Sequence, residues 1–277
     1  MTCSATKSDR ILFEMWLWHK RLGHLSFSYL KKLKPHLFTE LQILDLQCDI
    51  CELAKSHYKP FSSSLNKSSK PFMVIRYDIW GPATIPSMSK AHYFITFIDE
   101  CTRMTWVSFL HKKSDASTVC QEFHNMVKTQ FQKQIQVLQS NNSMEFLANS
   151  FGNYLWQHGI RHHTSCPDKP QQNGLAERKN RQIIEMAHAS LFGMNMSCFY
   201  WGEAVKFVVY IINRVPSRVI EFQTPYQKLQ TFFETPHQPN LEPRIFGCTV
   251  YVHIPKVLRS KLDPCAQRCV FVGYFNF

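Results

Sequence analysis

The order of apolar runs between Phe72 and Val215 constrains the fold of this chain more than any other feature. Three strand-like runs come first, and shorter strand-like runs then alternate with segments of helical spacing. We expect strands at Phe72–Trp80, Ala91–Asp99, Met104–His111, Gln134–Gln139 and Ile160–Ser165. We expect helices at Ser114–Lys133, Phe146–His158, Gly174–Phe192 and Tyr200–Val215. This order predicts an α/β fold in which helices flank a mixed sheet.

A second pattern, of histidines and cysteines, precedes these runs. Four residues separate His19 from His24, two separate Cys48 from Cys51, and 23 residues lie between the pairs. Zinc binds four nitrogen or sulfur ligands tetrahedrally, and a CxxC turn can place two thiolates on one ion. Apolar residues at helical spacing around the histidines predict one helix that presents both rings. We therefore expect a small structural zinc module. The alternative is two incidental histidines and two buried thiols.

One carboxylate, Glu177, stands among cations where a polar loop runs into a helix. Residues 167–181 read PDKPQQNGLAERKNR. An acid in such surroundings suits a metal held beside a polyanion. The alternative is an exposed helix whose Glu177 only pairs with Arg181, four residues on. Asp78 lies at the end of the first predicted strand, where a lone carboxylate suits neither a hydrophobic core nor a strand. It can therefore be paired with Glu177 as a second acidic residue of the same site.

The charge of the chain favours a polyanionic partner. Lysine and arginine outnumber aspartate and glutamate by 32 to 20, which gives a formal net charge of +12. Nucleic acid is the expected partner. The alternative is that the chain is merely a basic soluble protein. The candidates for phosphate contacts are Lys169, Gln172, Asn173, Arg178, Lys179 and Arg181. Each of them could instead be a solvated charge or polar group. The longest apolar stretch, Phe207–Ile212, is far shorter than the roughly 20 residues of a membrane span.

Taken in order, these motifs closely resemble the integrase of Ty1/copia-type long-terminal-repeat retrotransposons, especially those of plants. The resemblance covers nearly the whole chain and is carried by LWHKRLGHLSFSYL, CDICELAKSH, YDIWGP, YFITFIDECTRMTWV, VLQSNNSMEF, TSCPDKPQQNGLAERKNR, WGEAVKFVVYIINRVPS and FGCTVYVHIPKVLRSKLDP. It implies an HHCC zinc-binding module like the GAG-pre-integrase module in residues 1–66. The polar, turn-rich sequence SSSLNKSSK after Phe61 is itself typical of a linker. The resemblance further implies a ribonuclease-H-like integrase core in residues 67–230 and a truncated SH3-like β module in residues 231–277. We interpret the chain as a fragment of the Gag-Pol polyprotein of a decaying element.

The resemblance also implies a catalytic site. In this family, two aspartates and a glutamate hold two divalent metals for in-line phosphoryl transfer. Motif by motif, these positions correspond to Asp78, Asn141 and Glu177, and 35 residues lie between the last two, as in the family's D,D-35-E pattern. The second position is therefore an amide, which cannot bridge two metals as a carboxylate does. The family's RSDNGGEF is QSNNSMEF here, so Gln139, Ser143 and Met144 also depart from it. Glu145 is not expected to substitute, because the family carries a glutamate there that is not a ligand.

We therefore expect a DDE-type polynucleotidyl transferase fold with a degenerate D-N-E metal site. The implied activity is DNA integration by 3′-end processing and strand transfer, inactive as written because of Asn141. The alternatives are a catalytically silent DNA-binding module and a remnant that does not fold stably. The implied cofactors are structural Zn²⁺ at the four histidines and cysteines and Mg²⁺ or Mn²⁺ at Asp78 and Glu177. The implied partners are element-end and target DNA and further copies of the chain, in the nucleus, with no membrane and no small-molecule substrate.

Overall fold

A computed structural model describes residues 7–38, 46–54, 68–140, 149–164, 174–234 and 242–274. The chain divides into two compact units, each discontinuous in sequence. The sheet unit comprises His57–Ile184 and Val209–Pro239; the helix-hairpin unit comprises Met1–Ser56, Glu185–Val208 and Asn240–Phe277. The contiguous division into residues 1–66, 67–230 and 231–277 stays a prediction. No helix in the described ranges is both long and apolar enough to cross a membrane.

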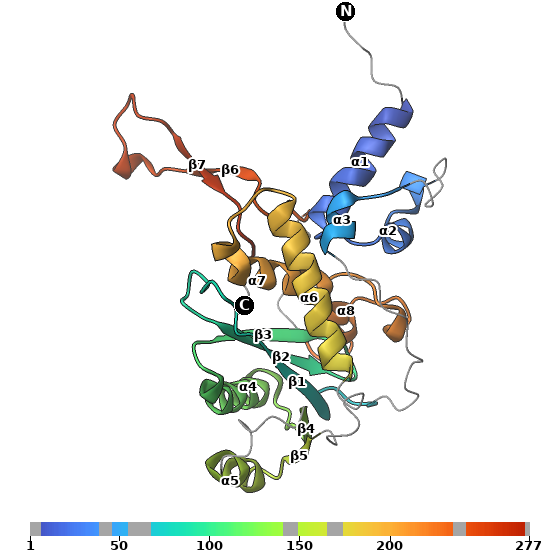
Figure 1. Ribbon diagram of the computed structural model, residues 1–277, viewed down its shortest axis with the longest axis vertical. Coiled ribbons are helices and arrows are strands. Elements are labelled where there is room, and N and C mark those ends of the chain that lie inside the picture. Colours follow the sequence, from blue (N-terminus) through green and yellow to red (C-terminus); the bar gives the residue numbers. More distant parts are fainter. Residues whose placement is uncertain are drawn as a thin grey trace, which may run out of the picture. The chain divides into compact units, whose positions relative to one another are not determined.

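The sheet unit is built on five strands in the order β3-β2-β1-β4-β5 (Figure 1). Their bounds are β1 Val74–Trp80, β2 Tyr93–Asp99, β3 Thr105–Leu110, β4 Val137–Ser140 and β5 Arg161–Thr164. β1, β2 and β3 pair antiparallel, whereas β4 and β5 pair parallel to β1 and to one another. The predicted mixed α/β sheet is therefore confirmed, with each strand a little shorter than its apolar run.

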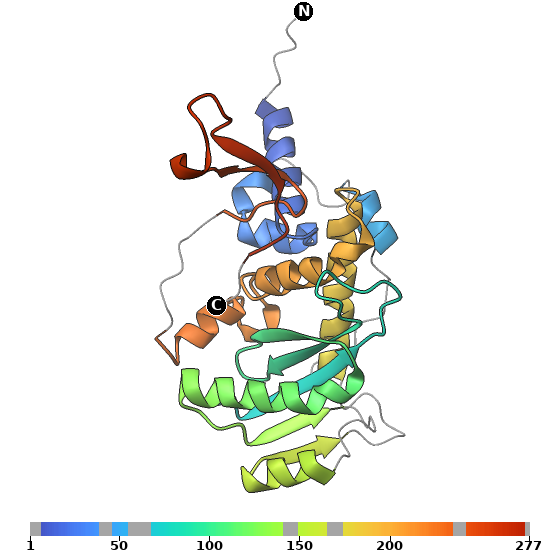
Figure 2. The same ribbon diagram turned by 90° about the vertical axis from the view of Figure 1, so that its left-hand side faces the viewer.

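One face of this sheet carries the main hydrophobic core of the unit. Alternation along β1 turns Ile75 and Tyr77, both fully buried, toward this face. The helices α4 (Ala116–Phe131) and α5 (Asn149–Gln157) cover it, and Figure 2 shows α4 running alongside the strands. Phe123 of α4 stacks on Phe97 of β2 with ring centroids 4.1 Å apart. Because Asp78 follows Tyr77 in the strand, its side chain belongs to the opposite face.

The opposite face receives the first part of α6 (Gly174–Phe192), whose bounds match the predicted helix. Ala176, Asn180 and Ile183 are buried and recur at helical spacing, so they form the inward stripe of this helix. The end of α7 (Trp201–Ile212) and α8 (Pro225–Gln230) complete the sheet unit. The Asp78 side chain belongs to the same face of the sheet as α6. It therefore points toward this helix.

The helix-hairpin unit contains α1 (Lys7–Arg21), α2 (Phe27–Leu33) and α3 (Asp49–Ala54). It also contains the ends of α6 and the start of α7, and a hairpin of β6 (Thr249–His253) and β7 (Ala266–Val270) that corresponds to the expected SH3-like module. The expected single helix with both histidines is wrong. α1 ends at Arg21, because Gly23 and His24 adopt left-handed φ angles of 62° and 59° that no helix can contain.

Candidate metal centre and carboxylate site

His19, His24, Cys48 and Cys51 form one compact cluster, in which the possible ligand atoms all lie within 4.8 Å of one another. Cys48 Sγ is 3.4 Å from His24 Nδ1, and Cys51 Sγ is 3.4 Å from His19 Nε2 and 3.7 Å from His24 Nδ1. Zn–S and Zn–N bonds at a tetrahedral angle imply a sulfur-to-nitrogen distance of about 3.6 Å. The donor set and its spacing therefore fit one zinc ion.

The two histidines offer different nitrogens to the cluster. His19 Nδ1 lies 2.7 Å from the Leu25 carbonyl oxygen, so this nitrogen carries the proton and Nε2 is left for the metal. His19 also stacks on Phe27, with ring centroids 4.4 Å apart. Nearly all of this arrangement is buried, with His19 and His24 at 0% and 3% exposure. Four ligands with no exposed histidine give a closed set, which is typical of a structural site rather than a catalytic one.

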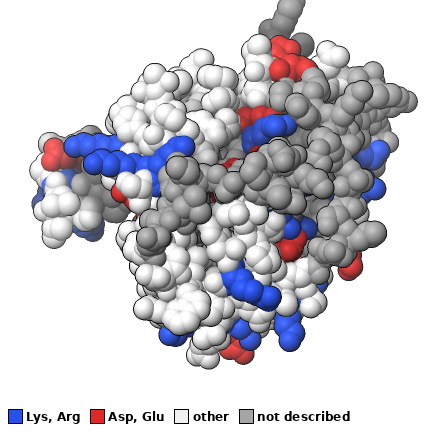
Figure 3. Space-filling view, turned by 60° about the horizontal axis from the view of Figure 1, so that its bottom comes forward, with Lys and Arg blue, Asp and Glu red and all other residues white. Residues whose placement is uncertain are grey.

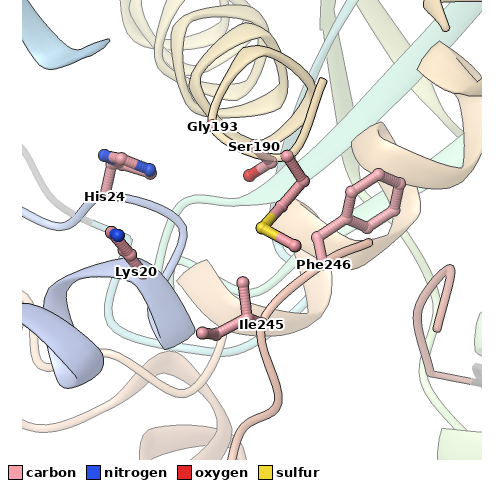
Figure 4. Close-up of a pocket in the computed structure, with 7 residues that line it drawn as sticks. Lys20, His24, Ser190, Gly193, Ile245 and Phe246 are labelled. Atoms are coloured by element: carbon pink, nitrogen blue, oxygen red, sulfur yellow. The ribbon is translucent and has the colours of Figure 1, made fainter. Parts of the chain in front are cut away.

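His24 turns its other nitrogen toward a small pocket inside the same unit. Figure 4 shows His24 and Lys20 on one side of this pocket, and Ser190 with Phe246 on the other. A Cβ atom added at Gly193 would lie only 3.0 Å from His24 Nε2 and 3.0 Å from the Ala189 carbonyl oxygen. The end of α6 therefore approaches the histidine closely because residue 193 has no side chain.

Asp78 is the centre of the second cluster, on the α6 face of the sheet. Its Oδ2 accepts a hydrogen bond of 3.0 Å from Asn180 Nδ2 on α6. Asn180 Oδ1 accepts one of 2.7 Å from the hydroxyl of Thr96, the β2 residue that pairs with Asp78 across the strands. Glu177 stands one helical turn before Asn180 and therefore on the same side of α6. The structure thus brings α6 and its glutamate to Asp78.

The electrostatics of Asp78 reflect this placement. Burial raises the pKa of Asp78 to about 6; the neighbouring Glu177 carboxylate raises it further, while hydrogen bonds from the Ile79 backbone and Asn180 oppose the rise. A buried carboxylate beside another acid is an environment that favours either a proton or a bound cation. The carboxylates of Asp78 and Glu177 are oxygen ligands of the kind that a hard divalent metal prefers.

Stability of the metal-free chain should therefore fall as the pH rises from about 4 to about 6. The folded state holds the Asp78 proton in this window and the unfolded state, with a pKa near 4, releases it. The expected loss is about 1–2 kcal/mol, allowing for partial exposure of the side chain. Urea unfolding across this range should show the loss in the parent and not in Asp78→Asn. Asp263→Asn, at an exposed aspartate whose pKa is lowered by hydrogen bonds from Ser260, should retain it. An Asp78→Asn chain with the parental profile would contradict this assignment.

A hydrogen-bonded group joins the three parallel strands next to this cluster. His162 Nε2 on β5 lies 2.9 Å from the Tyr77 hydroxyl and 3.0 Å from Ser140 Oγ at the end of β4. Burial lowers the pKa of His162 and raises that of Tyr77, so a neutral imidazole meets a protonated phenol. Tyr77 immediately precedes Asp78, and Ser140 immediately precedes position 141. The network therefore links β1, the strand that carries Asp78, to the ends of β4 and β5.

The predicted phosphate-binding residues differ in their exposure. Arg178 and Arg181 are exposed on α6. Lys179 is half-buried rather than exposed, and it donates to Gln182 Oε1 at 3.2 Å. Burial and the nearby Arg103 lower its pKa to about 8. Lys169, Gln172 and Asn173, together with Asn141, Ser143, Met144 and Glu145, lie outside the described residues.

Two residues at the carboxylate site were not expected from the sequence. Asn180 follows Glu177 at a spacing of three, and this spacing is the only signal that could have marked it. Thr96 lies within an apolar strand run and differs in no visible way from other strand threonines. Only the pairing of β1 with β2 places it opposite Asp78.

The chain matches three domain models in sequence order. These are the GAG-pre-integrase domain over residues 1–56, the integrase core domain over residues 68–170 and the retroviral polymerase SH3-like domain over residues 248–276. It is 36% identical over 260 residues to the retrovirus-related Pol polyprotein from transposon TNT 1-94 of Nicotiana tabacum, and 38% identical over 262 residues to that from transposon RE2 of Arabidopsis thaliana. Each alignment covers 93% of this chain but only 19% and 17% of the respective relative.

A solved structure shares the fold. A chain of the simian T-cell lymphotropic virus intasome, determined by cryo-electron microscopy in complex with the PP2A regulatory subunit B56 gamma, aligns with a TM-score of 0.50. The alignment covers 86% of this chain and 87% of that one at 15% identity. At this identity the match concerns the architecture alone.

Proposed function

This chain belongs to the integrases of retrotransposon Pol polyproteins, and on that premise we propose that its sheet unit is a DNA-integration core whose metal site is impaired by Asn141. The observation that carries the proposal is the approach of α6, with Glu177, to Asp78 on one face of a ribonuclease-H-like sheet. Asp78 and Glu177 supply carboxylate oxygens, which are the ligands that Mg²⁺ and Mn²⁺ prefer. When bound there, such metals would activate the attacking water in 3′-end processing or the attacking 3′-hydroxyl in strand transfer, and would stabilise the leaving oxygen.

The residues of the chain itself support metal binding better than they support catalysis of phosphoryl transfer. Asp78 is held in place by Asn180, and its raised pKa favours a neighbouring cation. Position 141 contributes an amide in place of a carboxylate, so one charged ligand is missing. We assign zinc at the His19 cluster to folding alone, since four protein ligands leave no open position for chemistry.

Nucleic acid is the partner that the exposed cations of α6 support. Arg178 and Arg181 follow Glu177 by one and four residues, so they can hold a phosphate backbone beside the carboxylate site. We include Lys169, Gln172, Asn173 and the half-buried Lys179 in this proposed surface. Figure 3 shows lysines and arginines in several separate groups on the face turned to the viewer, so local contacts rather than one broad basic patch carry the proposal. Assembly on element ends and target DNA as a homo-oligomer in the nucleus belongs to the same proposal.

A second function is favoured by one observation. Because Asn141 removes a charged metal ligand and leaves the cations untouched, a catalytically silent DNA-binding module would retain the phosphate contacts. The two functions predict the same DNA binding and differ in metal-dependent strand cleavage.

Binding to a short DNA duplex should weaken steeply with salt. Each phosphate contact contributes about −0.9 to the slope of log Kobs against log salt concentration. Arg178→Gln and Arg181→Gln should each reduce the slope by about 1 and weaken binding equally for unrelated sequences. Fluorescence anisotropy from 50 to 300 mM salt would measure this.

The matched control is Lys128→Gln, on α4, which covers the other face of the sheet. It should leave the slope unchanged. A slope that responds to Lys128→Gln but not to the two α6 variants would remove α6 from the DNA-binding surface.

A further inference from the structure

We propose that Asn180 is a positioning residue for the metal site, which acts through a hydrogen-bond relay from Thr96 through Asn180 to Asp78. The relay would set the orientation of the Asp78 carboxylate and its separation from Glu177. This inference rests on the proposed function, because Asn180 can position a metal ligand only if a divalent metal binds at Asp78.

The direction of the relay follows from its donors and acceptors. The Thr96 hydroxyl lies 2.7 Å from Asn180 Oδ1, and Asn180 Nδ2 lies 3.0 Å from Asp78 Oδ2. A rotation of the amide by 180° would turn its oxygen toward the oxygen of an ionised Asp78, which is repulsive. The hydroxyl donates to the amide oxygen, and the amide NH₂ must then face Asp78. Thr96 and Asn180 are 0% and 4% exposed, so water does not compete for these bonds.

The relay joins the two elements that carry the acidic residues. Thr96 and Asp78 are register partners on β2 and β1, so the sheet fixes one end. Asn180 and Glu177 share one side of α6, so the helix fixes the other. A hydrogen bond that holds Asn180 to Asp78 therefore also limits how far Glu177 can move from Asp78. The same bond occupies one lone pair of Asp78 Oδ2 and so restricts rotation of the carboxylate.

Metal affinity should therefore depend on residues that do not touch the metal. Removing a hydrogen-bond partner of a metal ligand typically weakens binding by about 10-fold to 100-fold. In an Asn141→Asp background, loaded with zinc, we expect Asn180→Ala to raise the Mn²⁺ dissociation constant about 10-fold or more. Thr96→Val, which keeps the shape and removes the hydroxyl, should raise it several-fold, whereas Thr96→Ser should restore the parental value.

A second buried asparagine provides the control for stability. Asn213 is also 4% exposed and bonds to a sheet threonine, with Nδ2 at 2.7 Å from the Thr105 carbonyl oxygen and Oδ1 at 2.9 Å from the Thr105 backbone nitrogen. Asn213→Ala should lower the urea midpoint as much as Asn180→Ala does. Unlike Asn180→Ala, it should leave Mn²⁺ affinity unchanged, which separates positioning from a purely structural role.

The experiment combines isothermal titration with Mn²⁺ and nuclear magnetic resonance of the Asn180 side-chain amide in the metal-free chain. We expect slow exchange of these amide protons with water, and faster exchange in Thr96→Val. Folded Asn180→Ala and Thr96→Val chains that bind Mn²⁺ as tightly as their parent would overturn the inference, as would rapid exchange in the parent. An Asn141→Asp parent that binds no Mn²⁺ would overturn the proposed function and the metal-related role of Asn180 with it. The amide signals would then report on the relay alone.

Discussion

Removal of zinc is expected to unfold α1, α2 and α3 while the five-stranded sheet stays folded. The four ligands come from α1, the turn after it and the CxxC segment, so one ion would tie together residues up to 32 positions apart. The binding free energy of a structural zinc, about 10–16 kcal/mol in small zinc modules, is folding free energy for such a site. A strong chelator, or Cys51→Ala, should therefore abolish the order of this region.

Hydrogen exchange read by mass spectrometry can follow both units in the full chain. Metal analysis should find one zinc per chain in the parent and none in Cys51→Ala. The matched control is Cys198→Ala, at an exposed cysteine outside the cluster, which should keep both zinc and protection. Unchanged protection of α1 and α3 after chelation would show that the cluster is not what holds this module together.

Restoring the second acidic residue should produce the largest gain in activity. We expect the chain as written to process and join DNA ends no faster than Glu177→Gln, because an amide at position 141 holds a hard cation more weakly than a carboxylate and cannot bridge two. Asn141→Asp should raise strand transfer with Mn²⁺ by about 10²–10³-fold, the typical value of one group that stabilises developing charge. Phosphate binding through Arg178 and Arg181 should change little.

The glycines of the family motif provide a second step. Ser143 and Met144 stand where the family has glycine, which accepts backbone conformations that other residues resist. Adding Ser143→Gly and Met144→Gly to Asn141→Asp should therefore increase activity further. A Glu177→Gln substitution in each background measures any contaminating nuclease. Activity of the unmodified chain well above its Glu177→Gln control would show that Asn141 does not disable the site.

The sequence alone determined the elements of both candidate sites. The HxxxxH and CxxC spacings identified the ligand set that the structure gathers within 4.8 Å. Period-2 and helical patterns identified the five strands and the helix that carries Glu177, because burial of one face is a local, repeating constraint on residue type. The resemblance to the integrase family then assigned Asp78, Asn141 and Glu177, an assignment that stays a prediction at position 141.

Only the tertiary structure decided how those elements meet. The helical pattern runs through His24, yet the left-handed turn at Gly23 and His24 ends α1 and places the His24 ring beside Cys48 and Cys51. Lys179 looks like any solvated helix cation, but its neighbour Arg103 comes from a turn far away in sequence. The link from Thr96 through Asn180 to Asp78 joins residues up to 102 positions apart. Contacts at such separations depend on strand register and helix docking, which no local pattern encodes.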